Sequence, residues 1–177
     1  EAQRPHEAWP LNSPSASDLH WLKMTEGKKE VWRAVGPPAG NDSLFKMPYP
    51  ENIKLSLPPS AEPGLDALPS EFVKLYRLDS LATDEEDPYR AVLVSLAQSL
   101  YIDAIAPIIL GFLSFIGNMR PDYKRLLELK DPRALLLLAY WFAKACQVQN
   151  WWISRRAALE GHAICIYLER YHRHQAD

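Results

Sequence analysis

The chain has 177 residues, of which 20 are Lys or Arg and 22 are Asp or Glu, giving a formal net charge of -2. This length suits one domain better than two. The near balance of charge provides no general positive field for nucleic acid phosphates, which argues against a DNA-binding or RNA-binding domain. Hydrophobic residues make up 47% of the chain and charged residues 24%, values that are typical of a folded globular protein.

The N-terminus, the apolar runs and the cysteines bear on the cellular location. The longest nearly apolar run, residues 104–117, is shorter than the roughly 20 residues of a membrane-spanning helix. The N-terminal residues lack the apolar stretch of a secretory signal. Cys146 and Cys165 are too few for a disulfide scaffold and fit a reducing compartment. We therefore expect an intracellular protein without a membrane span and, because the first residue is Glu1, a longer parent chain.

Proline separates two parts of different character. Eleven of the 15 prolines lie at or before Pro69. Because proline lacks an amide donor and has a fixed φ, this part disfavours long helices and central strands. We predict an extended segment over residues 1–16, a helix over 17–35 that Ser17 or Asp18 caps, and a proline-rich wrapping loop over 36–69. Within that loop, residues 53–57 could form a short edge strand.

From Ser70 onward the pattern is helical. Ser70 is the predicted N-cap of a short helix, and Asp87-Pro88 and Asp131-Pro132 each place a capping carboxylate before a proline in the first turn. Further helices are expected over residues 88–103, 104–117, 122–128, 132–147 and 150–172, with 104–117 kinked near Pro107. The predicted fold is all-α, with six or seven irregular helices, and residues 70–177 form the helical core of one domain together with 17–69.

Patterns for catalysis and metal binding are weak. Glu169 and His172 have the spacing of helical metal ligands, but no second Glu-x-x-His occurs, so a solvated C-terminal turn is the preferred interpretation. The cysteines have no CxxC partner and are interpreted as buried thiols. Asp103, beside long apolar runs, is either a carboxyl with a raised pKa or, preferably, a helix cap. No nucleophile elbow or phosphate-binding loop is present, so no catalytic residue, metal or cofactor is predicted.

Aromatic residues form the other conspicuous group. The segment 134–143 is apolar all round the helix and should lie at the centre of the domain. Large rings follow closely along the chain: Tyr140, Trp141, Phe142, Trp151 and Trp152. Such a group is usually core, and the alternative is an apolar ligand cavity between helices. The arginines of the last predicted helix are interpreted as a solvated face.

Residues 131–168, DPRALLLLAYWFAKACQVQNWWISRRAALEGHAICIYL, resemble the C-terminal region of fungal zinc-cluster transcription factors of the sterol uptake control protein type. The resemblance rests on a Pro-x-Ala-Leu helix from Pro132 to Ala139 and on Trp151, Trp152 and Ile153. SDLHWLKMTEG and EEDPYRAVLVSL upstream are similar to the family's Leu-His-Trp-Leu and Pro-Tyr helices. The six cysteines of the family's DNA-binding module are absent from this chain.

The resemblance implies an all-helical regulatory domain, present in the nucleus and cytoplasm, that binds a sterol or a similar apolar molecule and forms a homodimer. It implies no direct nucleic acid contact by this chain. The helix pattern alone places the pocket. The residues expected to line it are Ile109, Phe112, Leu113, Leu137, Tyr140, Trp141, Trp151, Trp152 and Ile164.

Two other classes of function stay open at this point. A helical fold with an apolar cavity could cyclise or isomerise a terpenoid or polyketide intermediate, because orientation alone lowers such barriers and no catalytic triad is needed. The third class is a helical dimerisation module that binds no ligand.

Overall fold

The computed structural model describes residues 4–15, 18–24, 68–77, 87–101, 115–147 and 151–173, except the side chains at 98, 101, 151 and 152. Within these ranges the chain contains seven α-helical stretches, one short 3-10 helix and no β-strand, which confirms the predicted all-α class. The chain divides into two compact units, one formed by residues 1–19 and 63–177 and the other by 20–62. Within the described ranges, no helix is both long and apolar enough to cross a membrane.

The N-terminal segment is not extended as predicted. Residues Pro5–Glu7 form the 3-10 helix η1, and turns continue to Asn12 because the amides of Glu7, Ala8 and Leu11 donate to nearby carbonyls. Asp18 caps the turn before it, since its Oδ2 accepts from the amide of Ser15 at 2.9 Å. In the second unit, residues 20–24 are helical within the predicted helix 17–35. Ser17, most of the wrapping loop, the 53–57 strand and Pro107 lie outside the described residues.

The short helix α2 spans Ser70–Leu75. Its N-cap is Pro69 and it has no side-chain capping bond, so the predicted cap at Ser70 is wrong by one residue. The shift places Ser70 inside the first turn, where its amide needs no helical partner. Phe72, the buried residue of α2, faces the rest of the first unit.

The Asp131-Pro132 helix start is confirmed, whereas the helix after Asp87-Pro88 begins two residues later than predicted. Helix α3 spans Arg90–Tyr101, and Asp87 Oδ1 accepts from the amide of Tyr89 at 2.9 Å. Helix α6 spans Pro132–Gln147, as predicted, and Asp131 Oδ1 accepts from the amide of Ala134 at 2.9 Å. In each case the carboxylate satisfies an amide that has no partner inside the helix.

Helix α5, Pro121–Glu128, ends in a tight corner immediately before α6. The amides of Lys130 and Asp131 donate back to the carbonyls of Leu127 and Leu126, each at 2.9 Å, which is the Schellman pattern of helix termination. Lys130 has a φ of 56°, in the left-handed region that glycine usually fills. The same two residues therefore close one helix and open the next.

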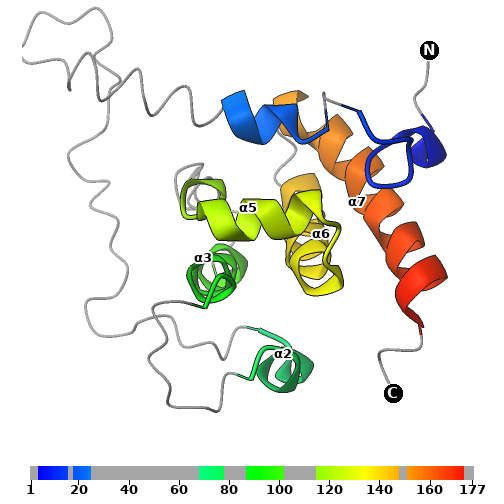
Figure 1. Ribbon diagram of the computed structural model, residues 1–177. Helices are drawn as coiled ribbons and strands as arrows, with labels where there is room; N and C mark the ends of the chain where they lie inside the picture. The colour runs from blue at the N-terminus through cyan, green and yellow to red at the C-terminus, as the bar shows by residue number, and fades with distance from the viewer. Residues whose placement is uncertain are drawn as a thin grey trace, which may run out of the picture. The chain divides into compact units, whose positions relative to one another are not determined.

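Helix α7 spans Trp151–His172 and packs against α6, which also contacts α3 and α5 (Figure 1). The two helices run antiparallel, because Tyr167 near the end of α7 lies 5.6 Å from the ammonium group of Lys130, just before α6. That ammonium group also donates to the carbonyl of Pro10 at 2.6 Å, and η1 contacts α7. Lys130 thus ties the N-terminal turns to the α6–α7 pair.

Replacing Asp131 should cost more stability than replacing Asp87. The variant Asp87→Ala loses a helix cap, worth about 1 kcal/mol. Asp131→Ala loses a cap and also the acceptor of the buried Tyr89 hydroxyl, for a total of about 2–4 kcal/mol. Urea denaturation measures both values, and Asp131→Asn, which keeps an acceptor oxygen, should lose less. Equal losses for the two alanine variants would contradict this account.

Gly161 lies close to α6, because a Cβ at this position would lie 3.2 Å from Cβ of the fully buried Phe142. Gly161→Val should therefore destabilise the protein by about 2 kcal/mol through overpacking. The matched variant Ala158→Val, on the exposed side of the same helix, should cost only about 0.5 kcal/mol of helix propensity. Thermal or urea unfolding that ranks the two variants equally would show that the helices can move apart freely.

Candidate functional site

Three of the residues expected to line an apolar pocket lie in the core. Leu137 and Trp141 of α6 and Ile164 of α7 have no exposed surface. The Trp141 ring stacks on Phe115 with centroids 5.3 Å apart and planes at 13°, and it lies 5.4 Å from the ring of Phe142. We call five buried side chains of these elements the aromatic layer: Phe115, Leu137, Trp141, Phe142 and Ile164.

The other expected lining residues do not join this layer in the described part of the chain. Tyr140 is half-buried, and its ring makes an edge contact with Phe72 of α2 at 4.8 Å. It therefore faces α2 and not the stack around Trp141. Trp151 and Trp152 begin α7, but their side chains lie outside the described set, as do Ile109, Phe112 and Leu113 altogether.

A second buried group surrounds the first turn of α6. Among the described residues, three tyrosine hydroxyls donate to this turn: Tyr76 to the carbonyl of Arg133 at 2.7 Å, Tyr89 to Asp131 Oδ1 at 2.9 Å, and Tyr123 to the carbonyl of Ala134 at 2.9 Å. The Arg133 guanidinium lies 4.6 Å from the Tyr89 ring centroid, in cation–π geometry. Tyr76, Tyr89 and Tyr123 are at most 6% exposed. We call them the tyrosine cluster.

Burial makes these phenols hard to ionise. Desolvation first, and then the hydrogen bond to Asp131, raises the pKa of Tyr89 to about 12. Desolvation, followed by the charge interaction with Tyr89, raises the pKa of Tyr76 further still, and desolvation raises that of Tyr123 well above 10.0. The tyrosine cluster therefore donates hydrogen bonds at neutral pH and offers no base or nucleophile.

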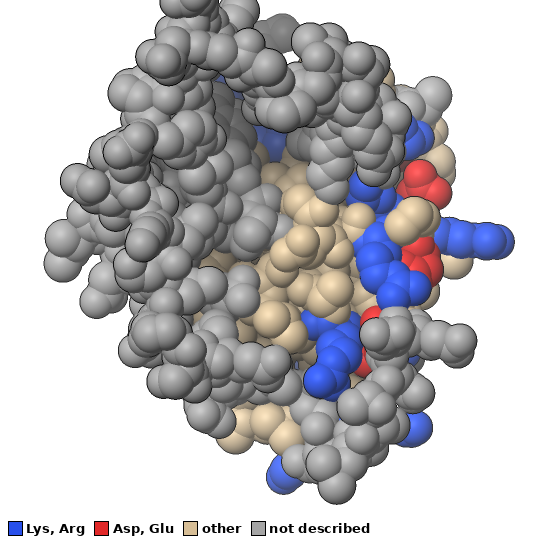
Figure 2. Space-filling model, turned by 90° about the vertical axis from the view of Figure 1, so that its left-hand side faces the viewer, with Lys and Arg blue, Asp and Glu red and all other residues tan. Residues whose placement is uncertain are grey.

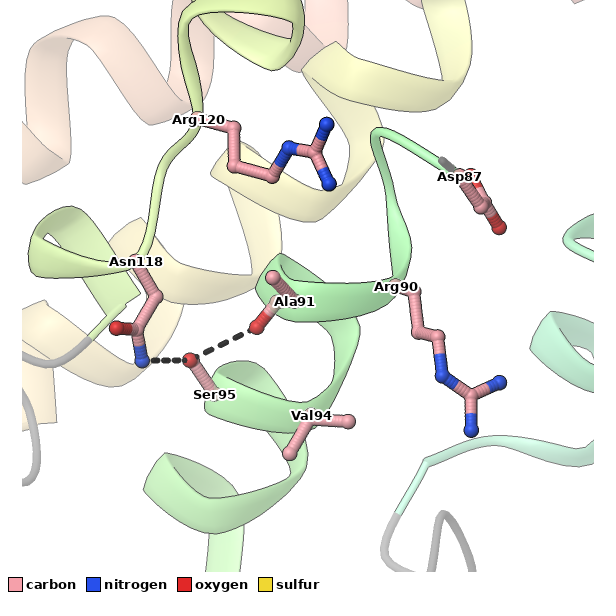
Figure 3. A pocket seen from close by; sticks show the side chains of 7 residues that line it. All are labelled: Asp87, Arg90, Ala91, Val94, Ser95, Asn118 and Arg120. Carbon is pink, nitrogen blue, oxygen red and sulfur yellow. Dashed lines mark hydrogen bonds between the residues drawn. The ribbon is translucent and has the colours of Figure 1, made fainter. Parts of the chain in front are cut away.

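A surface hollow of ≈ 330 Å³ lies between the start of α3 and the segment that precedes α5 (Figure 3). Ala91, Val94 and the buried Ser95 line it from α3, and Asp87, Arg90, Asn118 and Arg120 are its other lining residues. Ser95 Oγ donates to the carbonyl of Ala91 at 2.9 Å and accepts from Asn118 Nδ2 at 2.7 Å. This pair of hydrogen bonds attaches the 118–120 segment to α3 and so shapes the hollow.

Sequence reasoning missed this hollow. It treated Asp87 as a helix cap, which the structure confirms, and residues 118–121 as a break between helices. The observed break is shorter by one residue, because described helical residues end at Gly117 and resume at Pro121. The only signal in the sequence is the presence of Arg90 and Arg120 beside these breaks. No local sequence pattern indicates that these two segments meet, because the Asn118–Ser95 hydrogen bond that joins them spans 23 positions.

The cysteine interpretation is wrong, because both Cys146 and Cys165 are exposed. Each lies on the outer side of its helix, where apolar periodicity does not bury it. Desolvation and the nearby Glu169 nevertheless raise the pKa of the Cys165 thiol, so it is not an activated nucleophile. Among the described residues, no three His, Cys, Asp or Glu side chains are grouped to hold a metal ion, and Glu169 is exposed.

The arginines of α7 lie on its solvated side, as predicted. The exposed ones are Arg155, Arg156 and Arg170, and Arg173 directly after the helix is also exposed. Arg156 forms an i, i+4 ion pair with Glu160 at 2.5 Å. Such exposed pairs contribute little to stability.

Comparison with protein-family models, with curated proteins and with solved structures found no match to this chain.

The tyrosine cluster predicts a loss of stability at high pH. A pKa that folding raises means that the folded state holds the proton more tightly, so stability is complete below pH 10.0 and falls as pH rises toward 12. Tyrosinate absorbance and circular dichroism should show ionisation together with unfolding. Tyr89→Phe should weaken this pH dependence, whereas Tyr171→Phe, at a side chain that is 65% exposed, should not alter it. Ionisation of Tyr89 without unfolding would contradict the assignment.

Proposed function

We propose that this chain is a ligand-responsive regulatory domain of a fungal transcription factor, and that it binds a sterol or a similar apolar molecule between its helices. The observation that carries the proposal is the position of the segment with the family resemblance. Residues 131–168 supply α6 and most of α7, and four of the five members of the aromatic layer come from these helices. In the proposal this nuclear and cytoplasmic domain forms a homodimer and makes no direct contact with DNA.

The aromatic layer supports a site for a rigid, flat ligand. The stacked rings of Phe115 and Trp141 offer large apolar faces that a four-ring molecule could replace or extend. Burying about 400 Å² of apolar ligand surface would contribute at most about 10 kcal/mol, before association costs of several kcal/mol. Micromolar affinity is compatible with these values.

The close contact of Gly161 with Phe142 restricts where such a ligand could enter. At this level a Cβ would already be crowded, so α6 and α7 leave no space for a ring between them. The side of Trp141 that stacks on Phe115 is the better candidate, because only ring faces would have to separate there. Regulation further requires that one conformation bind the ligand better than another, and α7 is the proposed moving element.

Ligand binding should raise the melting temperature of the purified chain. At an ergosterol concentration about 100 times Kd, the gain of about 2.7 kcal/mol corresponds to a rise of roughly 5–10 °C for a chain of this length. Ile164→Phe, which adds volume to the aromatic layer, should remove the shift. The matched variant Ile166→Phe, at a half-exposed position on the same helix, should keep it. Circular dichroism establishes that both variants fold.

Native mass spectrometry of the freshly purified chain, together with the thermal shift and an assay for product formation, distinguishes a ligand-binding domain from a dimerisation module and from an enzyme. A co-purifying lipid together with two subunits supports the proposal. A tight dimer with neither lipid nor thermal shift contradicts ligand binding and supports a dimerisation module. Conversion of a polyene substrate into product contradicts the regulatory proposal and supports the enzyme alternative.

A further inference from the structure

We propose that the hollow between α3 and the segment before α5 is a second binding site, one that takes a small amphipathic carboxylate. This site is separate from the apolar site proposed above, because none of the expected pocket residues lines it. Its walls combine an apolar floor with guanidinium groups on the rim, and it opens to solvent.

The size of the hollow limits the ligand. At about 30 Å³ for each water-sized group, ≈ 330 Å³ accommodates about ten non-hydrogen atoms. A four-ring sterol is far larger than this. A carboxylic acid with a short alkyl chain has the appropriate volume, and an opening to solvent suits a ligand that keeps one polar end hydrated.

The guanidinium groups of the hollow, and not its net charge, favour an anion. Arg90 and Arg120 contribute two positive charges to the lining and Asp87 one negative charge, and the neighbouring Asp122, which pairs with Arg120, balances the remaining charge. The Asp87 carboxylate is already engaged as the cap of α3, where its Oδ1 accepts from the amide of Tyr89 at 2.9 Å. Guanidinium groups are the side chains best suited to a carboxylate, because their donors match its two oxygens.

The two arginines come from different elements and reach different parts of the hollow. Arg120 extends from the segment before α5 across toward the first turn of α3, whereas Arg90 extends along the side of α3 that faces away from Ala91 (Figure 3). Arg120 also pairs with Asp122 at 3.1 Å, with about half of each side chain exposed at 45% and 40%. Such an exposed pair is weak, so an incoming carboxylate can compete with Asp122 for the guanidinium.

The floor supplies the apolar part of the site. Ala91 and Val94 present alkyl groups from neighbouring turns of α3, and the Ser95 hydroxyl is engaged by Ala91 and Asn118. An alkyl chain on this floor therefore displaces water without leaving a buried polar group unpaired. A purely inorganic anion would gain nothing from these residues.

Selectivity has to come from the individual guanidinium groups. On the face drawn in Figure 2, Lys and Arg side chains gather along one side, and Asp and Glu lie among them. Mixed charges of this kind give no uniform field at ordinary salt concentration, where charges are screened over about 8 Å. Binding at the hollow should thus depend on Arg90 and Arg120 and not on the total charge of the chain.

Isothermal titration calorimetry with octanoate tests this site directly, using the whole chain. Octanoate is expected to bind, and 1-octanol, which has an alkyl chain of the same carbon number without the charge, is expected to bind at least tenfold more weakly, a difference in binding free energy of about 1.4 kcal/mol. Arg90→Gln and Arg120→Gln should each weaken octanoate binding by roughly 3- to 10-fold. Arg125→Gln, an exposed arginine of α5 outside the hollow, is the matched control and should bind octanoate like the unchanged chain.

Several outcomes would overturn the proposal. They are equal binding of octanol and octanoate, equal losses in Arg90→Gln and Arg125→Gln, or inorganic phosphate binding as tightly as octanoate. Circular dichroism melting curves of every variant establish that a loss of binding is not a loss of fold. Because ergosterol is tested through the Ile164→Phe variant and octanoate through the arginine variants, failure of either proposal leaves the other intact.

Discussion

The first turn of α6 is the constraint on which the described part of the first unit depends. Its cap, Asp131, satisfies the amide of Ala134 and accepts the hydroxyl of Tyr89 with the same oxygen. Tyr76 and Tyr123 donate to carbonyls of the same turn. Each such bond contributes about 1 kcal/mol, but leaving a buried hydroxyl or carboxylate without a partner costs more. The tyrosine cluster therefore holds the end of α2, the start of α3 and the first turn of α5 at one place along α6.

This arrangement also positions the surface hollow. Tyr89 directly precedes Arg90, so its hydrogen bond to Asp131 fixes the start of α3 relative to α6. Tyr123 similarly fixes the first turn of α5, three residues after Arg120. The Asn118–Ser95 bond then closes the gap between the two elements. The walls of the hollow are thus attached to the hydrogen bonds around the first turn of α6, and the two arginines extend from these attached segments.

Local signals in the sequence predicted the helices well, because capping and proline placement act within one turn. Asp87-Pro88 and Asp131-Pro132 marked two helix starts, and the apolar pattern of 132–147 gave the bounds of α6. Contacts between distant residues were not predictable in this way. The bond from Tyr76 to Arg133 spans 57 positions, and nothing in the sequence distinguishes a tyrosine that donates to a helix start from one that is simply buried. Lys130 ends α5 without the glycine that normally marks such a turn.

The same difference between local signals and long-range contacts applies to the candidate sites. The sequence predicted that Leu137, Trp141 and Ile164 would lie in the interior, and they do, but it could not separate a ligand cavity from ordinary packing. Helical periodicity shows which residues face inward and contains no information about whether a gap exists between them. Tyr140 was assigned to the same group and instead contacts Phe72, because α2 covers that side of α6 and periodicity does not show which helix lies opposite.

The free energies of exposing and burying apolar surface limit how an apolar ligand could act on the aromatic layer. Separating the stacked rings of Phe115 and Trp141 would expose about 200 Å² of apolar surface, a cost of roughly 5 kcal/mol. Burial of a sterol contributes at most about 10 kcal/mol, and this offsets the cost only if the sterol covers both ring faces again. A ligand that separated the rings and left either one exposed would not bind. In the proposal, a ligand that displaced Trp141 would press on Phe142, whose ring centroid lies 5.4 Å away and whose Cβ lies close to Gly161 of α7. Such a displacement would move α7, which is the response to ligand that we propose.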